Sequence, residues 1–119
     1  LMTRLPEYDW GWAGFNDTLN RAHIDTALPN KAFEYLGCGL PILTLPHAAL
    51  ARFVAAEGVG IVLRRPEDAA AAVRDADVVA LRRRVADVRR QFTAERNTQR
   101  LARLYGELIT LRPVAPVGA

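Results

Sequence analysis

Apolar residues occur in two patterns along this chain: short continuous runs, and longer stretches in which they recur every three or four positions. The runs at 41–45 and 59–63 are nearly all apolar, which is typical of parallel strands buried on both faces. An aromatic-rich run at 8–15, ended by Asn16-Asp17 as a turn signal, predicts another strand. Strands that alternate with helices over short links indicate an α/β fold with a parallel, doubly wound sheet.

The helical pattern is clearest in the second half of the chain. Residues 48–57 carry an apolar stripe that Gly58 closes, and Pro66 with two following acids predicts a helix that runs to about Arg74. Thr93 is a credible N-cap for the last helix. One apolar stripe precedes Thr93 and is expected to face a core: Leu81, Val85, Val88 and Phe92. A second stripe lies on the last helix itself: Leu101, Leu104, Tyr105 and Leu108.

The number of strands suggests part of a larger unit. About three can be counted, fewer than the five or six of an ordinary sheet. We expect one partial domain at 1–110 and a tail at 111–119, in a chain that starts at Leu1 as if excised from a longer protein. Alone, it would expose a sheet edge that invites pairing with a second copy, as a homodimer.

Residues 27–44 carry the most specific pattern, a short helix that leads into a buried strand. Pro29 suits the first helical position, Gly39 suits the left-handed residue that ends a helix, and Pro41 prevents continuation, so the helix spans about ten residues. The N-cap then falls on Leu28, which has no oxygen to accept the first free amides. Alternatively Asn30 is the N-cap, or Thr26 caps a helix that starts earlier.

Candidate chemistry gathers at the start of this helix. Asn30, Lys31 and Glu34 have the spacing that places three side chains on one face. Free amides beside a lysine form a ready anion site, usually for phosphate. Lys31 is the only lysine among sixteen basic residues, which favours a specific requirement for lysine at this position.

The string Leu28-Pro29-Asn30-Lys31-Ala32-Phe33-Glu34-Tyr35-Leu36, followed by Gly39-Leu40-Pro41-Ile42, resembles the donor-site segment of retaining two-domain (GT-B) glycosyltransferases of the family 4 type. The resemblance covers most of 8–110, but only 28–44 is specific. It implies the C-terminal part of a Rossmann-like donor domain that transfers a hexose from a nucleoside-diphosphate sugar to an acceptor held by a missing N-terminal domain.

The resemblance also implies roles for single residues. Glu34 matches the glutamate that binds the nucleotide ribose, and the backbone at Leu28, Pro29, Asn30 and Lys31 matches the segment near the phosphates. Where many members carry a sugar-binding glutamate this chain has Thr26, so Asp25, Thr26 and Ala27 are the candidates for sugar contact. No catalytic residue is assignable, neither metal nor cofactor is expected, and the chain alone is expected to be inactive.

Several other polar or aromatic residues have a plain and a functional interpretation. Trp10 and Trp12 are expected to pack on one face of a sheet rather than to stack on a ligand. His23, with Asn16, Asn20 and Asp25, falls in a predicted loop at 16–27, and His47 follows a strand at the edge where α/β sheets bind ligands. Asp9 and the small Cys38 are expected to be structural, and Arg64 and Arg65 to be solvated.

Composition narrows the classes of protein to which the chain can belong. Half of the 119 residues are apolar, no run approaches the roughly 18 to 20 of a membrane span, and one cysteine excludes an intrachain disulfide. We expect a cytoplasmic protein. The net charge of +3 suits an anionic ligand or peripheral contact with the inner face of a membrane, whereas arginines mixed with acids do not indicate nucleic acid. The alternatives are a non-catalytic interaction module that has lost donor binding and a nucleotide-sugar epimerase of the same architecture.

Overall fold

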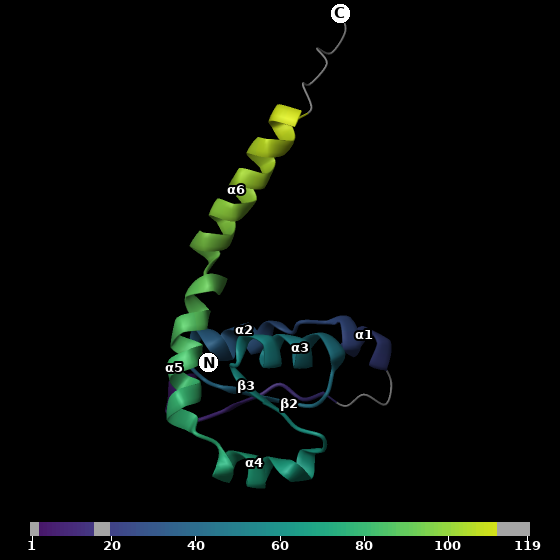
Figure 1. Ribbon diagram of the computed structural model, residues 1–119, viewed down its shortest axis with the longest axis vertical. Coiled ribbons are helices and arrows are strands. Elements are labelled where there is room, and N and C mark those ends of the chain that lie inside the picture. Colours follow the sequence, from purple (N-terminus) through teal and green to yellow (C-terminus); the bar gives the residue numbers. More distant parts are fainter. Residues whose placement is uncertain (1–2, 16–19, 112–119) are drawn as a thin grey trace, which may run out of the picture.

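The computed structural model of the chain describes residues 3–15 and 20–111 (Figure 1). Three short parallel strands form its sheet: β1 (Gly11–Trp12), β2 (Ile42–Thr44) and β3 (Gly60–Val62), in the order β1-β2-β3. All three residues of β2 are buried, as expected for a central parallel strand. The predicted mixed α/β fold with a parallel sheet is therefore confirmed.

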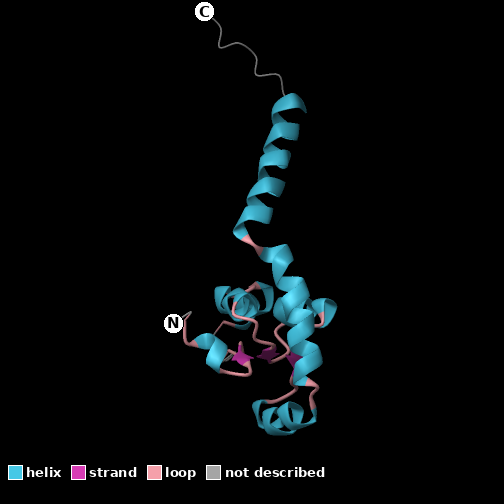
Figure 2. Cartoon of the chain, turned by 90° about the vertical axis from the view of Figure 1, so that its left-hand side faces the viewer, coloured by secondary structure: helices cyan, strands magenta, loops and turns pink. Residues whose placement is uncertain are grey.

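Helices make up most of the described chain. Both α2 (Asn30–Gly37) and α3 (Ala48–Glu57) lie on one side of the sheet, and α4 (Ala69–Asp75) lies on the other (Figure 1). Figure 2 shows the last helix extending away from the body of the molecule. The remaining helices are α1 (Arg21–Thr26), α5 (Val78–Val88), α6 (Ala94–Leu111) and the short 3-10 helices η1 (Leu5–Glu7), η2 (Pro66–Asp68) and η3 (Arg89–Phe92).

The end of α2 follows the predicted glycine signal. Gly39 has a φ of 81°, in the left-handed region that favours glycine, and its amide donates to the Leu36 carbonyl at 2.9 Å. The next amide, of Leu40, donates to the Tyr35 carbonyl at 2.9 Å, which completes the paired hydrogen bonds of a Schellman motif. This turn directs the chain from α2 into β2.

The core lies between the sheet and the helices α2, α3 and α5. Val85 and Val88 of the predicted stripe are fully buried, and Phe92 packs against the core cluster. Its ring lies 5.7 Å from the ring of Phe33 and 5.4 Å from that of Phe53, centroid to centroid, at tilted or edge-on angles that aromatic pairs favour. This contact fixes α5 and η3 against α2 and α3.

Three predicted boundaries were wrong. The strand expected at 8–15 pairs only at Gly11 and Trp12, at one edge of the described sheet. The expected loop at 16–27 contains α1, and its residues 16–19 lie outside the described residues. The helix predicted from Pro29 begins at Asn30, with Pro29 as its N-cap, and has eight residues rather than about ten.

The last helix, α6, buries none of its residues. Thr93 caps it as predicted, since its Oγ1 accepts from the Arg96 amide at 3.3 Å. The apolar stripe faces solvent, and its leucines at 101, 104 and 108 are 49–51% exposed. None of the helices within 3–15 and 20–111 is both long enough and apolar enough to cross a membrane.

Candidate functional site

The carboxyl ends of the three strands meet at one edge of the sheet, together with the start of α2. Phe15 follows β1, His47 follows β2, and Arg64 follows β3. Since α2 connects two parallel strands, it runs back along the sheet and begins at this edge. In open α/β sheets, ligands bind outside this edge.

The first turn of α2 is open. Its N-cap residue, Pro29, provides no side-chain cap, and the Pro29 carbonyl accepts from the amide of Ala32 at 3.0 Å. No described residue accepts a hydrogen bond from the amides of Asn30 and Lys31. Both capping alternatives were wrong: Asn30 is the first helical residue, and the Thr26 hydroxyl donates to carbonyls of its own helix, at Ala22 and His23.

The two charged residues at this turn are both partly buried. The Lys31 ammonium lies 4.5 Å from the centre of the Phe15 ring, a favourable cation–π contact that holds it over the sheet edge. The Glu34 side chain forms neither a hydrogen bond nor an ion pair with any residue that the structure describes. A partly buried carboxylate without a partner is available to a ligand.

The candidate sugar-binding residues have structural contacts. Asp25 accepts from the Ala48 amide at 3.3 Å, at the start of α3, and its other oxygen lies 3.7 Å from Nε of Arg21. Thr26 is exposed, and Ala27 ends α1 with its amide bonded to the His23 carbonyl at 3.0 Å. Leu28, from the predicted phosphate segment, is 44% exposed. Of the residues predicted to contact the sugar, the phosphates or the ribose, only Asp25 lines the pocket beside this site.

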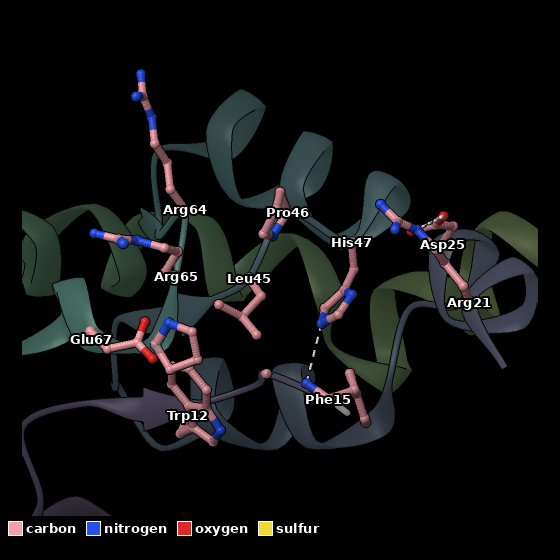
Figure 3. A pocket seen from close by; sticks show the side chains of 12 residues that line it. Trp12, Phe15, Arg21, Asp25, Leu45, Pro46, His47, Arg64, Arg65 and Glu67 are labelled. Carbon is pink, nitrogen blue, oxygen red and sulfur yellow. Dashed lines mark hydrogen bonds and ion pairs between the residues drawn. The ribbon is translucent and has the colours of Figure 1, made fainter. Parts of the chain in front are cut away.

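That pocket lies at the carboxyl edge and has a volume of about 770 Å³ (Figure 3). This volume is within the range of ligand sites in proteins. Its wall is part aromatic and apolar, part charged, and the residues come from β1, from the loops after all three strands, from α1 and from η2: Trp12, Gly14, Phe15, Arg21, Asp25, Leu45, Pro46, His47, Arg64, Arg65, Pro66 and Glu67.

His47 connects the loop after β2 to the loop after β1, and both loops line this pocket. Its side chain is buried, and its Nε2 accepts a hydrogen bond from the Phe15 amide at 3.1 Å (Figure 3). An imidazole nitrogen that accepts a hydrogen bond carries no proton. The ring also lies edge-on to Phe15 at 5.6 Å between centroids. His47 therefore holds Phe15, and through it Lys31, at the edge of the sheet.

Replacing His47 tests whether its hydrogen bond to the Phe15 amide stabilises the fold. His47→Ala should lower the free energy of unfolding by about 1–3 kcal/mol, because the partly buried amide of Phe15 loses its acceptor. Urea unfolding followed by circular dichroism measures the change. His47→Gln should cost less, since its amide oxygen can accept the same hydrogen bond. Equal stability of His47→Ala and the parent chain would contradict the role.

Other candidates lie elsewhere or have a different environment than predicted. His23 is exposed on α1, Asn20 is the N-cap residue of that helix, and Asn16 lies outside the described residues. Asp9 forms an exposed ion pair, in which its Oδ1 lies 3.0 Å from a guanidinium nitrogen of Arg82. Trp12 shares a face of the sheet with Leu43 and Ile61, and its side chain, which is 39% exposed, lines the pocket.

Comparison of the chain with protein-family models, with curated proteins and with solved structures finds no match. Within the described residues, no three His, Cys, Asp or Glu side chains are grouped so that they could hold a metal ion. The function is therefore inferred from the residues and their geometry.

Proposed function

We propose that this chain is the nucleotide-sugar-binding part of a retaining GT-B glycosyltransferase of the family 4 type. It holds a nucleoside-diphosphate sugar, and a separate acceptor-binding domain completes the enzyme. The three parallel strands then belong to a larger Rossmann-like sheet of the donor domain. The motif at residues 28–44, which resembles the donor segment of this family, is the sequence support for the proposal.

One observation carries the proposal: the open first turn of α2 has an unpartnered carboxylate on its side. The amides of Asn30 and Lys31 have no acceptor among the described residues, and Glu34 has no donor there. An uncapped helix start attracts phosphate, and a carboxylate one turn further along suits the paired hydroxyls of a ribose. The same few residues thus provide complementary sites for the two halves of a nucleotide.

This arrangement suits the chemistry of glycosyl transfer. The leaving group is a diphosphate, so the transition state is stabilised by fixed dipoles and positive charge aimed at its oxygens. The start of α2 supplies the dipole and Lys31 the charge. Glu34 positions the ribose, and with it the phosphates, and takes no part in proton transfer.

A non-catalytic interaction module is the second candidate, and the sugar-binding positions favour it. Asp25 is engaged by the Ala48 amide and Arg21, and the hydroxyl of Thr26 is engaged by α1 carbonyls. A chain whose sugar contacts have become structural contacts would keep the fold without holding a donor. Ligand titration separates the two candidates.

The proposal predicts that the chain binds a nucleoside-diphosphate sugar. Calorimetric titration with UDP-, GDP-, ADP- and dTDP-sugars should give saturable binding for at least one of them. Lys31→Ala should lower the affinity for that nucleotide sugar about tenfold. The difference should shrink as salt is added, because the lysine acts through its attraction to the phosphate charge.

The matched control is Arg74→Ala, which removes the same charge from α4 on the other side of the sheet. The affinity of Arg74→Ala for the nucleotide sugar should equal that of the parent chain. If none of the four nucleotide sugars binds, the transferase proposal fails and the interaction module is favoured.

A further inference from the structure

The apolar stripe of α6 has the spacing of a helix that pairs with another helix. Its leucines recur at steps of three, four and three positions: Leu101, Leu104, Leu108 and Leu111. This is the heptad spacing of a coiled coil, in which the a and d positions form the seam between two helices. The helix extends away from the body of the molecule in both views, and none of its residues is buried (Figures 1 and 2). The whole seam is therefore accessible to a partner.

Two residues of opposite charge lie beside this seam. Arg100 directly precedes Leu101, and Glu107 directly precedes Leu108, so both occupy the g position of a heptad. Neither side chain forms a hydrogen bond or an ion pair with any residue that the structure describes. They are seven residues apart, about 10 Å along the helix, which is too far for them to pair with each other. Each can pair with a charge on a second helix.

One antiparallel register of two copies of α6 pairs both the leucines and the charges. When residue 94 of one copy lies beside residue 111 of the other, the two helices overlap over all 18 residues. Leu101 of each copy then lies beside Leu104 of the other. Arg100 lies beside residue 105 of the other copy, only two residues, or about 3 Å, from Glu107. The pair thus gains two identical ion pairs, related by the twofold axis of an isologous dimer.

A parallel pair does not offer the same contacts. In that arrangement a g position faces the following e position of the other helix, so Arg100 would face Tyr105. Glu107 would face position 112, which lies outside the described residues. A parallel pair also places both bodies at the same end, where the helix axes are only about 8–10 Å apart. Figure 2 shows the body at one end of α6, so an antiparallel pair places the two bodies at opposite ends.

We propose that α6 pairs with α6 of a second copy of this chain in an antiparallel coiled coil. The interface is self-complementary and closes with two copies, so it forms a dimer rather than a fibre. Asn97 occupies one seam position, and a polar residue there limits the register at a cost in stability. The dimer is therefore reversible. This inference goes beyond the proposed function, because α6 contributes no residue to the nucleotide site.

Sedimentation equilibrium of the whole chain tests the pairing. Over about a hundredfold range of concentration, the average mass should rise from near 13.1 kDa toward twice that value. Leu104→Glu should weaken the dimer about tenfold or more, because its carboxylate would lie against Leu101 of the other copy. Leu104 is exposed in the single chain, so the thermal unfolding of this variant should match that of the parent.

Charge substitutions test the antiparallel register. Arg100→Glu brings two carboxylates together at each contact, and Glu107→Arg brings two guanidinium groups together, so each variant alone should dimerise about tenfold more weakly. An equimolar mixture of the two should associate at least as tightly as the parent, because every such contact is then between opposite charges. The matched control is Arg103→Glu, which makes the same charge change at a position away from the seam. It should dimerise like the parent.

Three results would contradict the proposal. A chain that stays at the monomer mass over the whole concentration range would overturn it, and a dimer that Leu104→Glu leaves intact would show that another surface pairs. If the mixture of Arg100→Glu and Glu107→Arg gains no affinity over either variant alone, the antiparallel register fails. Leu104→Glu should bind nucleotide sugars like the parent, so failure of the dimer and failure of the proposed function are distinguishable.

Discussion

Glu34→Ala is expected to lower the affinity for a bound nucleoside-diphosphate sugar ten- to a hundredfold. A hydrogen bond to a charged group contributes about 1.5–3 kcal/mol, and the carboxylate has no hydrogen bond or ion pair within the described residues. Inorganic diphosphate should bind the variant and the parent equally, because it lacks a ribose. Calorimetric titration of both ligands measures the two affinities.

Two variants control this experiment. Glu34→Gln keeps one acceptor oxygen and should lose less affinity, and Glu95→Ala removes an exposed carboxylate from α6 and should lose none. The unfolding temperature of Glu34→Ala should be close to that of the parent, since no hydrogen bond or ion pair within the described residues is removed. An equal loss of nucleotide and diphosphate binding would show that Glu34 does not contact the ribose.

Gly60→Ala should be the most destabilising small substitution in the sheet. A Cβ at this residue would overlap the Ile42 carbonyl of β2, a backbone atom that cannot move aside without breaking the pairing of β2 and β3. Overpacking a core costs about 1–3 kcal/mol and occasionally more, and here the obstruction is backbone. For a chain of this size, a loss of about 3 kcal/mol lowers the melting temperature by roughly 10 °C or more.

Gly37→Ala is the matched control. Gly37 ends α2, and a Cβ there has no described neighbour within 4 Å. Alanine in a helix is favoured over glycine by up to about 1 kcal/mol, so this variant should melt at or slightly above the parent temperature. Thermal unfolding of both variants by circular dichroism decides the comparison. A Gly60→Ala chain as stable as Gly37→Ala would contradict the close contact between β2 and β3.

Local signals predicted much of the fold. The bounds of α3 at 48–57 match the stripe and the closing glycine, since Gly58 has a φ of 65°. The turn after α2 also matches, because only Gly39 among its neighbours accepts a left-handed φ without strain. In both cases the deciding residue lies within the element or directly after it.

The missed helix, α1, has no comparable local signal. Its six residues lack an apolar period and are held by an ion pair between Arg21 and Asp25 at 3.7 Å and by contact with α3. Contacts between distant parts of the chain are not visible in a local pattern.

The site could be predicted only in part for the same reason. The sequence indicates an anion site at Asn30 and Lys31 because spacing on one helix sets which side chains are neighbours. It does not indicate that Asp25 accepts from Ala48, twenty-three residues later, or that Gly14 seats the ring of Trp12 at the pocket. These contacts depend on which loops meet at the sheet edge.

Amide chemical shifts of the ¹⁵N-labelled chain test most directly whether the start of α2 binds a nucleoside diphosphate. With inorganic diphosphate, the shifts of Asn30 and Lys31 should change, because their amides are open to an acceptor. With the nucleotide sugar that binds, the same amides and that of Glu34 should shift with one common affinity. A saturating nucleotide sugar that leaves residues 30–34 unshifted would contradict the account.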